Sequence, residues 1–326
     1  MNRFPIRIAS LIFNQAQAVL PITMDLVTQW ASHALNLNLV NVNLGGMPAP
    51  MAMDDDVDYG ARKAARDAAR LAAAHATGVQ VVPVHGLLVP RATHMDPCEQ
   101  STSYEDLRAQ LSAAMQDPMI EHIVLDVDSP GGSVAGCFEL ADDIHAWSQQ
   151  KPITAVVNYG GYSAAYALSS AASQVVVSPS SGVGSIGVIA RHVDMSKRNE
   201  ASGMNVTTIY AGAHKNDLSP HEPLSDQSAE FLRQMVNASY DQFVGAVSRY
   251  RGLDEQAVRD TEAQVYFGND GLTAGLADSV EAPQSAVNRI AAEVAAARSG
   301  RKPTASPMRK ASIAARAAAA DCRARA

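Results

Sequence analysis

Residues 128–132, Asp-Ser-Pro-Gly-Gly, could bind the developing negative charge of an acyl-transfer reaction. They stand where a strand-like run gives way to a helix-like run. Glycines there can present bare backbone N–H groups, and such groups at a helix start bind an oxyanion. Most turns of this composition only connect a strand to a helix. This stretch by itself therefore identifies no site.

A serine that could act as a nucleophile follows a second pair of glycines. Gly160, Gly161 and Tyr162 precede Ser163, and small residues begin with Ala164. At the mouth of a predicted helix the hydroxyl can project while a carbonyl substrate approaches, and the N–H of Ala164 would point at the same anion site. Serine is also a favoured N-cap residue, which is the simpler interpretation of this stretch taken alone.

A lysine that could act as a base lies in the stretch 211–217, just after a strand-like run. Most lysines are ordinary exposed residues, and Lys215 could be one of them. A lysine can act as a base near pH 7 only when it is neutral, and lowering its pKa from about 10.4 to about 7 costs roughly 4.6 kcal/mol. Burial in an apolar pocket can supply that shift, and a nearby hydroxyl could orient the amine.

Residues 161–165 also approximate the G-x-S-x-G nucleophile elbow of α/β-hydrolases, although the final glycine is missing. That mechanism requires an aspartate and then a histidine downstream. Asp194 with His214, or Asp217 with His221, has the right order, but both pairs are close to the serine for that fold. In an extended stretch His214 would point away from whatever Lys215 faces.

The remaining candidate side chains have simple explanations. Cys137 lies on an apolar helix face and is expected to be a packed small residue. Five histidines show no metal-ligand spacing and are expected to be surface or core residues: His85, His94, His122, His145 and His192.

The elements that must position these residues alternate between strands and helices. Strands are predicted over 79–84, 120–127, 153–157, 174–177 and 206–210, and helices over 104–116, 134–149, 163–172, 225–250 and 286–298. Parallel strands with crossover helices explain this alternation, so we predict an α/β fold.

The segments before and after these alternating elements differ from them in composition. We predict an N-terminal extension over 1–44 with a helix around 24–35, and an acidic linker and helix over 45–78, the helix spanning 60–76. The aspartates at 54–58 lack a chelating frame and are expected to be a solvated loop. The main domain is predicted over 79–283, and 284–326 as a helix and a mobile Ala/Arg-rich tail.

Composition excludes several classes of protein. The 326 residues are 47% apolar but only 5% aromatic, which excludes a disordered chain and a collagen. Three scattered cysteines argue against a disulfide framework or a structural zinc site. Residues 301–326 carry seven Lys and Arg against one Asp, a net charge of +6. Because the whole chain has a net charge of −7, the other 300 residues have a net charge of −13. The body is therefore not expected to bind nucleic acid.

The N-terminal residues resemble a signal peptide only in part. Arg3 and Arg7 could form a basic region, and Ala16-Gln17-Ala18 resembles a cleavage site. The apolar run 8–13 is short and polar residues follow it directly. No run reaches the ~18 apolar residues of a membrane span. We therefore expect a cytoplasmic protein without a membrane span.

Four motifs in this order resemble the signal peptide peptidase A family of Ser-Lys peptidases. They are residues 128–132, 162–166, 184–188 (Gly-Ser-Ile-Gly-Val) and 212–215 (Gly-Ala-His-Lys), and the resemblance extends over about 79–283. Residues 8–14 and 220–225 are similar to the phage and prophage capsid-protease branch. The resemblance implies a Clp protease/crotonase-like fold with repeated ββα/βα units.

The resemblance also implies a role for each matching residue. Ser163 matches the nucleophile, Lys215 the general base, and Ser185 a serine that orients the lysine. Gly132 and the Ala164 N–H match the oxyanion hole. No cofactor or metal is implied. The implied partners are protein substrates, namely scaffold, capsid or portal proteins or the chain itself, together with further copies in a homo-oligomer in the host cytoplasm or procapsid.

Three other functions remain open at this point. The chain could be an inactive structural head protein that retains the peptidase fold, a bacterial peptidase that degrades signal peptides, or a crotonase-like acyl-CoA enzyme. Intact catalytic positions argue against the first, and the missing anchor against the second. No visible nucleotide-binding feature supports the third.

Overall fold

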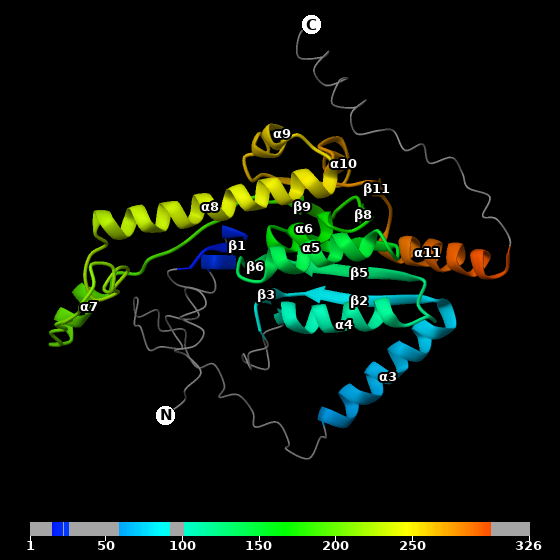
Figure 1. Cartoon of the computed structure of the whole chain (residues 1–326), viewed down its shortest axis with the longest axis horizontal. Helices are drawn as coiled ribbons and strands as arrows, with labels where there is room; N and C mark the ends of the chain where they lie inside the picture. The colour runs from blue at the N-terminus through cyan, green and yellow to red at the C-terminus, as the bar shows by residue number, and fades with distance from the viewer. Residues whose placement is uncertain (1–14, 22, 26–58, 92–100, 301–326) are drawn as a thin grey trace, which may run out of the picture.

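A seven-stranded, mostly parallel sheet forms the centre of the computed structural model, which describes residues 15–21, 23–25, 59–91 and 101–300 (Figure 1). The main order is β10-β9-β7-β5-β2; β8 also pairs with β7, and β11 with β8. The strands are β2 (Val79–His85), β5 (His122–Ser129), β7 (Ile153–Tyr162), β8 (Gln174–Val177), β9 (Gly182–Gly184), β10 (Val265–Phe267) and β11 (Ser279–Val280).

Helices cover both faces of this sheet because apolar residues point to both sides of its central strands. On β5, Ile123 and Leu125 belong to the larger core, while Val124 faces the other side. The larger core includes residues of α4 (Tyr104–Gln116), α5 (Cys137–Ser148), α6 (Ala164–Ser170) and α8 (Asp226–Arg251). The opposite core is closed by α11 (Pro283–Arg298), through Ala286, Ile290 and Val294.

The described part of the chain contains four further helices. They are α3 (Tyr59–Thr77), α7 (Ser196–Ala201), α9 (Glu255–Arg259) and α10 (Asn269–Thr273). Helix α3 contacts the edge strand β2, and Ala74 reaches the larger core. No helix among the described ranges is both long and apolar enough to cross a membrane.

A second, four-stranded sheet holds the glycine turn. Its order is β1-β6-β3-β4, formed by Gln17–Val19, Gly131–Ser133, Leu87–Val89 and Ser101–Ser103. The chain passes from β2 to β3, and from β5 to β6, across one residue each, Gly86 and Pro130. The units β2-β3-β4-α4, β5-β6-α5 and β7-α6 are the repeated ββα and βα units that we expected, so the α/β class is confirmed.

The core elements agree with the predictions to within a few residues, with one exception. Strand β8 has the predicted bounds, whereas β7 extends beyond the predicted end to Tyr162. The strand predicted over 206–210 is wrong, because this stretch has no ladder partner among the described residues. Val206, Ile209 and Tyr210 have strand-forming side chains, but all three are exposed. A β pattern without a neighbouring strand forms no sheet.

This exception belongs to an exposed arm, which we define as residues 190–225 between β9 and α8. Figure 1 shows α7 and the first turns of α8 at one end of the molecule, beyond the edge of the central sheet. Ser225 ends the arm as the N-cap of α8, where its hydroxyl accepts the Ser228 N–H at 3.2 Å. The arm thus emerges from the sheet and returns to the body through α8.

Some sequence predictions fall outside the described residues. Of the helix expected around 24–35, residues 24 and 25 are helical and the remainder is not described. The acidic residues 54–58, the tail 301–326, His94, Cys98 and Cys322 also lie outside the described ranges. The expected helix over 60–76 is α3.

Candidate functional site

Ser163 lies at the sharp turn between β7 and α6. Its φ of 55° and ψ of −118° are unusual for a residue with a side chain, and the residue is fully buried. The Ser163 N–H donates to the Gly184 carbonyl at 2.8 Å, which fixes the turn against β9. A strained backbone that its surroundings hold in place is typical of functional sites.

The Ser163 hydroxyl does not cap the helix that follows it. Ser163 occupies the N-cap position of α6, yet its side chain makes no capping hydrogen bond. The hydroxyl instead donates to the Gly187 carbonyl at 3.3 Å. The N-cap interpretation therefore fails at this serine, and the hydroxyl faces the segment that follows β9.

The glycine strand β6 lies directly beside this turn. An ideal Cβ on Gly131 would come within 3.0 Å of the Tyr162 carbonyl oxygen and 3.1 Å of the Ala164 nitrogen. One on Gly132 would meet the Leu88 carbonyl oxygen at 1.9 Å. Only glycine permits this approach, and the approach places β6 against the N-terminal end of α6. The structure thus brings Gly132 and Ala164 to the same place as Ser163.

Ser185 reaches the same place from the neighbouring strand. Strands β7 and β9 are parallel, with Tyr162 opposite Gly184, so Ser163 and Ser185 follow at matching positions. Ser185 is buried and also has a positive φ, of 53°. Its N–H donates to the Gln264 carbonyl at 2.8 Å. Two adjacent parallel strands therefore deliver two serines to one edge of the sheet.

Lys215 is not brought to this site within one chain. It lies on the exposed arm, in a turn closed by its own N–H donating to the Gly212 carbonyl at 3.0 Å. Within the described ranges its side chain makes no hydrogen bond or ion pair. The structure thus gathers Gly132, Ser163, Ala164 and Ser185, and holds the predicted base apart on a different segment.

The histidines of the hydrolase alternative are also on the arm. His214 pairs with Asp217, with Nδ1 and Oδ2 2.8 Å apart, and the hydrogen bond helps to lower the pKa of this aspartate. His221 Nδ1 lies 3.1 Å from Asn199 Nδ2. The hydroxyl of Ser163 is hydrogen-bonded to a backbone carbonyl instead. The geometry therefore gives no support to a Ser-His-Asp triad.

Cys137 is a packed residue, as its place on an apolar helix face predicts. It is fully buried, and burial raises the pKa of its thiol to about 12. Its sulfur lies 3.7 Å from the Ala164 carbonyl oxygen, behind the start of α6. A thiol with such a pKa is a poor nucleophile, so Cys137 supports the packing of α6.

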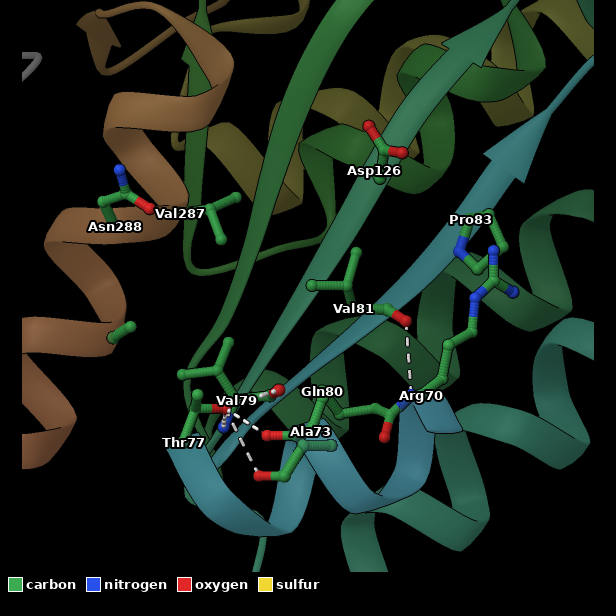
Figure 2. A pocket seen from close by; sticks show the side chains of 12 residues that line it. Arg70, Ala73, Thr77, Val79, Gln80, Val81, Pro83, Asp126, Val287 and Asn288 are labelled. Carbon is green, nitrogen blue, oxygen red and sulfur yellow. Dashed lines mark hydrogen bonds between the residues drawn. The ribbon is translucent and has the colours of Figure 1, made fainter. Parts of the chain in front are cut away.

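A cavity within the described part of the chain lies elsewhere. A space of about 320 Å³ opens between α3, β2 and α11. Figure 2 shows Arg70 on α3, Val81 and Pro83 on β2, and Asn288 on α11 around it. None of the predicted site residues lines this space. Over the described residues no group of three or more His, Cys, Asp or Glu side chains could hold a metal ion.

Sequence reasoning missed three short strands of this region: β6 and β9, whose glycines suggested turns, and β1. Strand β1, from the N-terminal extension, pairs with β6 directly at the glycine turn. The signal in the sequence was Ala16-Gln17-Ala18, which we considered only as an imitation of a signal-peptide cleavage site. Its small residues also fit a tightly enclosed strand.

Comparison with known proteins agrees with the motifs. Residues 145–297 match the model of peptidase family S49. The chain is 41% identical over 203 residues to capsid assembly protease C of Escherichia phage lambda, covering 62% of this chain and 46% of that protein. It is 40% identical over 214 residues to the head-tail preconnector protein GP5 of Enterobacteria phage P21, covering 66% and 43%. The chain thus spans less than half of the length of either relative.

Solved structures match more weakly. The 1510-N membrane-bound stomatin-specific protease matches with a TM-score of 0.42 at 14% identity, over 65% of this chain and 83% of that chain. An enoyl-CoA hydratase/isomerase family member matches with a TM-score of 0.41 at 14% identity, over 68% and 74%. The ClpP1 of Listeria monocytogenes matches with a TM-score of 0.39 at 12% identity, over 66% and 96%.

The sequence motifs and the family comparison agree with each other. The motifs around Ser163 and Lys215 fall inside the range matched by the family model, and the glycine turn lies just before it. Both phage proteins described above are similar to this chain over about 200 residues. Residues 145–297 of this chain thus match peptidase family S49, and the chain is similar to a phage capsid assembly protease over 203 residues.

Proposed function

We propose that this chain is a serine endopeptidase in which Ser163 is the nucleophile and Lys215 the general base. The observation that carries the proposal is the buried, strained turn at Ser163, whose hydroxyl is not used as a helix cap. Gly132 and Ala164 lie beside it, as an oxyanion hole requires. The match to a peptidase family supports the same chemistry.

The proposed reaction needs only side chains and backbone groups of the protein. Ser163 Oγ attacks the peptide carbonyl carbon while a neutral Lys215 takes its proton. The N–H groups of Gly132 and Ala164 stabilise the negative charge on the carbonyl oxygen. The protonated lysine then gives its proton to the leaving amine, and water releases the acyl group in a second, equivalent step. Ser185 orients the lysine amine.

We propose further that a second copy of the chain supplies Lys215, because the arm holds it away from Ser163. The arm and the start of α8 expose large apolar side chains: Met204, Val206, Ile209, Tyr210, Leu224 and Phe231. Ile209 is 95% exposed. Apolar side chains gathered on one protruding segment are typical of a contact surface. Docking against a second body would desolvate the lysine and thereby favour its neutral form.

The names of the two phage relatives support a proposal about substrates. One is named a capsid assembly protease and the other a head-tail preconnector protein. We propose that this chain processes scaffold, capsid or portal proteins, or itself, during procapsid maturation in the host cytoplasm or the procapsid. We also propose a peptidase domain over 79–283, with the extension 1–44, the linker and helix 45–78 and the segment 284–326 around it. Helix α11 of this last segment packs on the sheet.

The test expresses the full chain together with the head proteins of its own phage or prophage. Ser163→Ala and Lys215→Ala should each reduce processing by about a thousandfold or more, since both groups act in one step. Ser169→Ala is the matched control for the serine, because Ser169 is also buried in α6 and its hydroxyl donates to the Ala165 carbonyl at 2.7 Å. Lys197→Ala, also exposed on the arm, is the control for the lysine.

Intact masses of the same samples report self-processing. A mass difference between the wild type and Ser163→Ala would show that the chain cuts itself. If both substitutions leave the processing of every head protein and the mass of the chain unchanged, the peptidase mechanism is wrong. A structural head protein with a peptidase fold would then explain the similarity.

A further inference from the structure

A strand of the chain itself fills the space beside the proposed oxyanion hole. Strand β1 runs antiparallel to β6, with Ala18 opposite Gly132 and Val19 opposite Gly131. Its other edge pairs with the segment after β9, where Gln17 and Ile189 exchange two backbone hydrogen bonds of 2.8 Å. Strand β1 is therefore hydrogen-bonded on both sides, between the glycine strand and the segment that accepts the Ser163 hydroxyl.

The ladder register directs the Ala18 carbonyl toward Gly132. Leu20 donates to the Pro130 carbonyl at 3.0 Å, so these residues form a hydrogen-bonding pair. Such pairs recur every second residue of an antiparallel ladder, which makes Ala18 and Gly132 the next one. The N–H of Gly132, which we assign to the oxyanion hole, thus faces the Ala18 carbonyl oxygen.

The space beside Gly131 supports the same placement of this oxygen. An ideal Cβ on Gly131 would lie 2.2 Å from the Ala18 carbonyl oxygen and 3.1 Å from the Ala164 nitrogen. Ala18 O therefore lies close to the strand and the helix end that provide both proposed oxyanion donors. This is where a substrate places the carbonyl that is attacked.

The side chains of β1 fit an enclosed groove. Ala18 is fully buried and belongs to the larger core, and Ala16 and Val19 are also buried. Because Ala18 is fully buried, a larger side chain at this position would have to displace packed neighbours. The segment is further tied to the body beyond β1, where Arg191 binds the Asp25 carboxylate at 2.5 Å.

We propose that residues Ala16–Leu20 are an internal substrate mimic that occupies the peptide groove of this site. An extended protein substrate would take the same place by adding a strand between β6 and Ile189, with a small side chain at the Ala18 position. It can enter only after β1 has left. This inference rests on the proposed function of Ser163, and it adds the location of the groove, the size of the residue that it accepts and its control by the N-terminal segment.

Peptide binding tests the occupancy without any need for catalysis. The probe is a fluorescein-labelled peptide, Gln-Ala-Gln-Ala-Val-Leu-Pro, which repeats residues 15–21. It is titrated into the full chain carrying Ser163→Ala, alone or with Ala18→Asp, which places a charge in the buried position and expels β1. The expelled variant should bind at least about tenfold more tightly, because the fraction of open groove rises. Ala72→Asp, at an exposed position of α3, should change nothing.

Hydrogen exchange identifies where the peptide binds. In the Ala18→Asp chain the amides of Gly132 and Ile189 should exchange faster, and the peptide should restore their protection. Gln17→Pro provides a second way to release β1 if the first variant does not fold, since it removes the N–H that donates to Ile189. Circular dichroism establishes that each variant is folded.

The outcomes separate the two proposals. Equal peptide affinity in folded chains with and without the β1 substitutions, or no protection of Gly132 and Ile189 by bound peptide, would overturn the substrate-mimic inference. Hydrolysis of the same peptide by chains that retain Ser163 is measured in parallel. Tight binding without hydrolysis would instead count against the proposed catalysis while supporting the groove.

Discussion

Gly131 and Gly132 show at the scale of single residues why this turn needs glycine. The space beside Gly132 is filled by the backbone of Leu88, and that beside Gly131 by the Ala18 carbonyl. Backbone atoms of packed strands cannot move aside as the end of a flexible side chain can. The same close approach that excludes a side chain brings the two N–H donors of the proposed site together.

Gly132→Ala should therefore destabilise the chain by about 1–3 kcal/mol or more, because the new methyl group would lie 1.9 Å from the Leu88 carbonyl oxygen. Gly245→Ala is the matched control. Gly245 lies inside α8 with only side-chain atoms nearby, at 3.7 Å or more, so alanine should stabilise the helix there by roughly 0.5–1 kcal/mol. Urea denaturation of both variants measures the difference, and equal effects would contradict the steric argument.

His122 predicts a pH dependence of stability. Burial lowers the pKa of His122 to about 4, and its Nε2 lies 2.9 Å from Thr154 Oγ1. Between pH 6.5 and about 4 the unfolded chain binds a proton that the folded chain does not. The free energy of unfolding should therefore fall as the pH falls through this window, by up to about 1.4 kcal/mol per pH unit and roughly 3.4 kcal/mol in all.

His122→Asn should flatten this slope in denaturation curves measured at several pH values. His85 provides a control of opposite sign. A hydrogen bond to Asp126, 2.9 Å long, raises the pKa of His85, so its contribution is complete below pH 6.5 and is lost as the pH rises above it. His85→Asn should thus remove stability preferentially at low pH. A wild-type slope that survives His122→Asn unchanged would assign the effect to other groups.

At the scale of elements, the C-terminal end of α8 is fixed by an ion pair between the buried Arg251 and the half-buried Asp278. The Arg251 guanidinium donates to both oxygens of Asp278, at 2.8 and 2.9 Å, and to the Gly275 carbonyl. Asp278 in turn accepts the Val175 N–H at 2.7 Å. One buried arginine thus links α8, the helix that follows the arm, with the loop before β11 and with β8.

Arg251→Ala should cost about 3–5 kcal/mol of stability, because it removes a buried partner and leaves the Asp278 carboxylate without its countercharge. Arg249→Ala, on the same helix, is the control. The pair of Arg249 with Asp142 is 60% exposed on both sides, so its loss should cost no more than about 1 kcal/mol. Similar losses in the two variants would show that the pair of Arg251 with Asp278 does not anchor α8.

At the scale of the whole molecule, the separation of the two proposed catalytic residues determines what a single chain can do. Ser163 belongs to the central sheet, and Lys215 to an arm that Figure 1 shows extending past its edge. Docking of the arm on a second copy of the chain would complete the site and cover the exposed apolar side chains of the arm. Activity should then depend on assembly.

Mixing the two inactive variants tests this dependence. Ser163→Ala retains the lysine and Lys215→Ala retains the serine, so a mixed assembly contains some complete sites if the lysine comes from a second copy. About a quarter of the wild-type activity is expected after equal mixing when each site draws on two chains at random. A mixture as inactive as its components would show that Ser163 and Lys215 must belong to the same chain. Sedimentation of each sample establishes that the variants assemble.

The sequence by itself determined the alternation of strands and helices, the bounds of the core elements to within a few residues, and the residues that could do chemistry. These features are local: period-2 and period-3.6 apolar patterns, glycines at turns and small residues after Ser163. Only the tertiary structure decided that Gly132, Ala164 and Ser185 gather around Ser163, because strand order and the approach of β6 to α6 depend on contacts between distant segments. It also showed the stretch 206–210 unpaired on an exposed arm, and Ala16–Leu20 hydrogen-bonded between β6 and Ile189. A strand pattern in the sequence indicates that a segment can join a sheet. Whether a neighbouring strand lies beside it depends on how the whole chain packs.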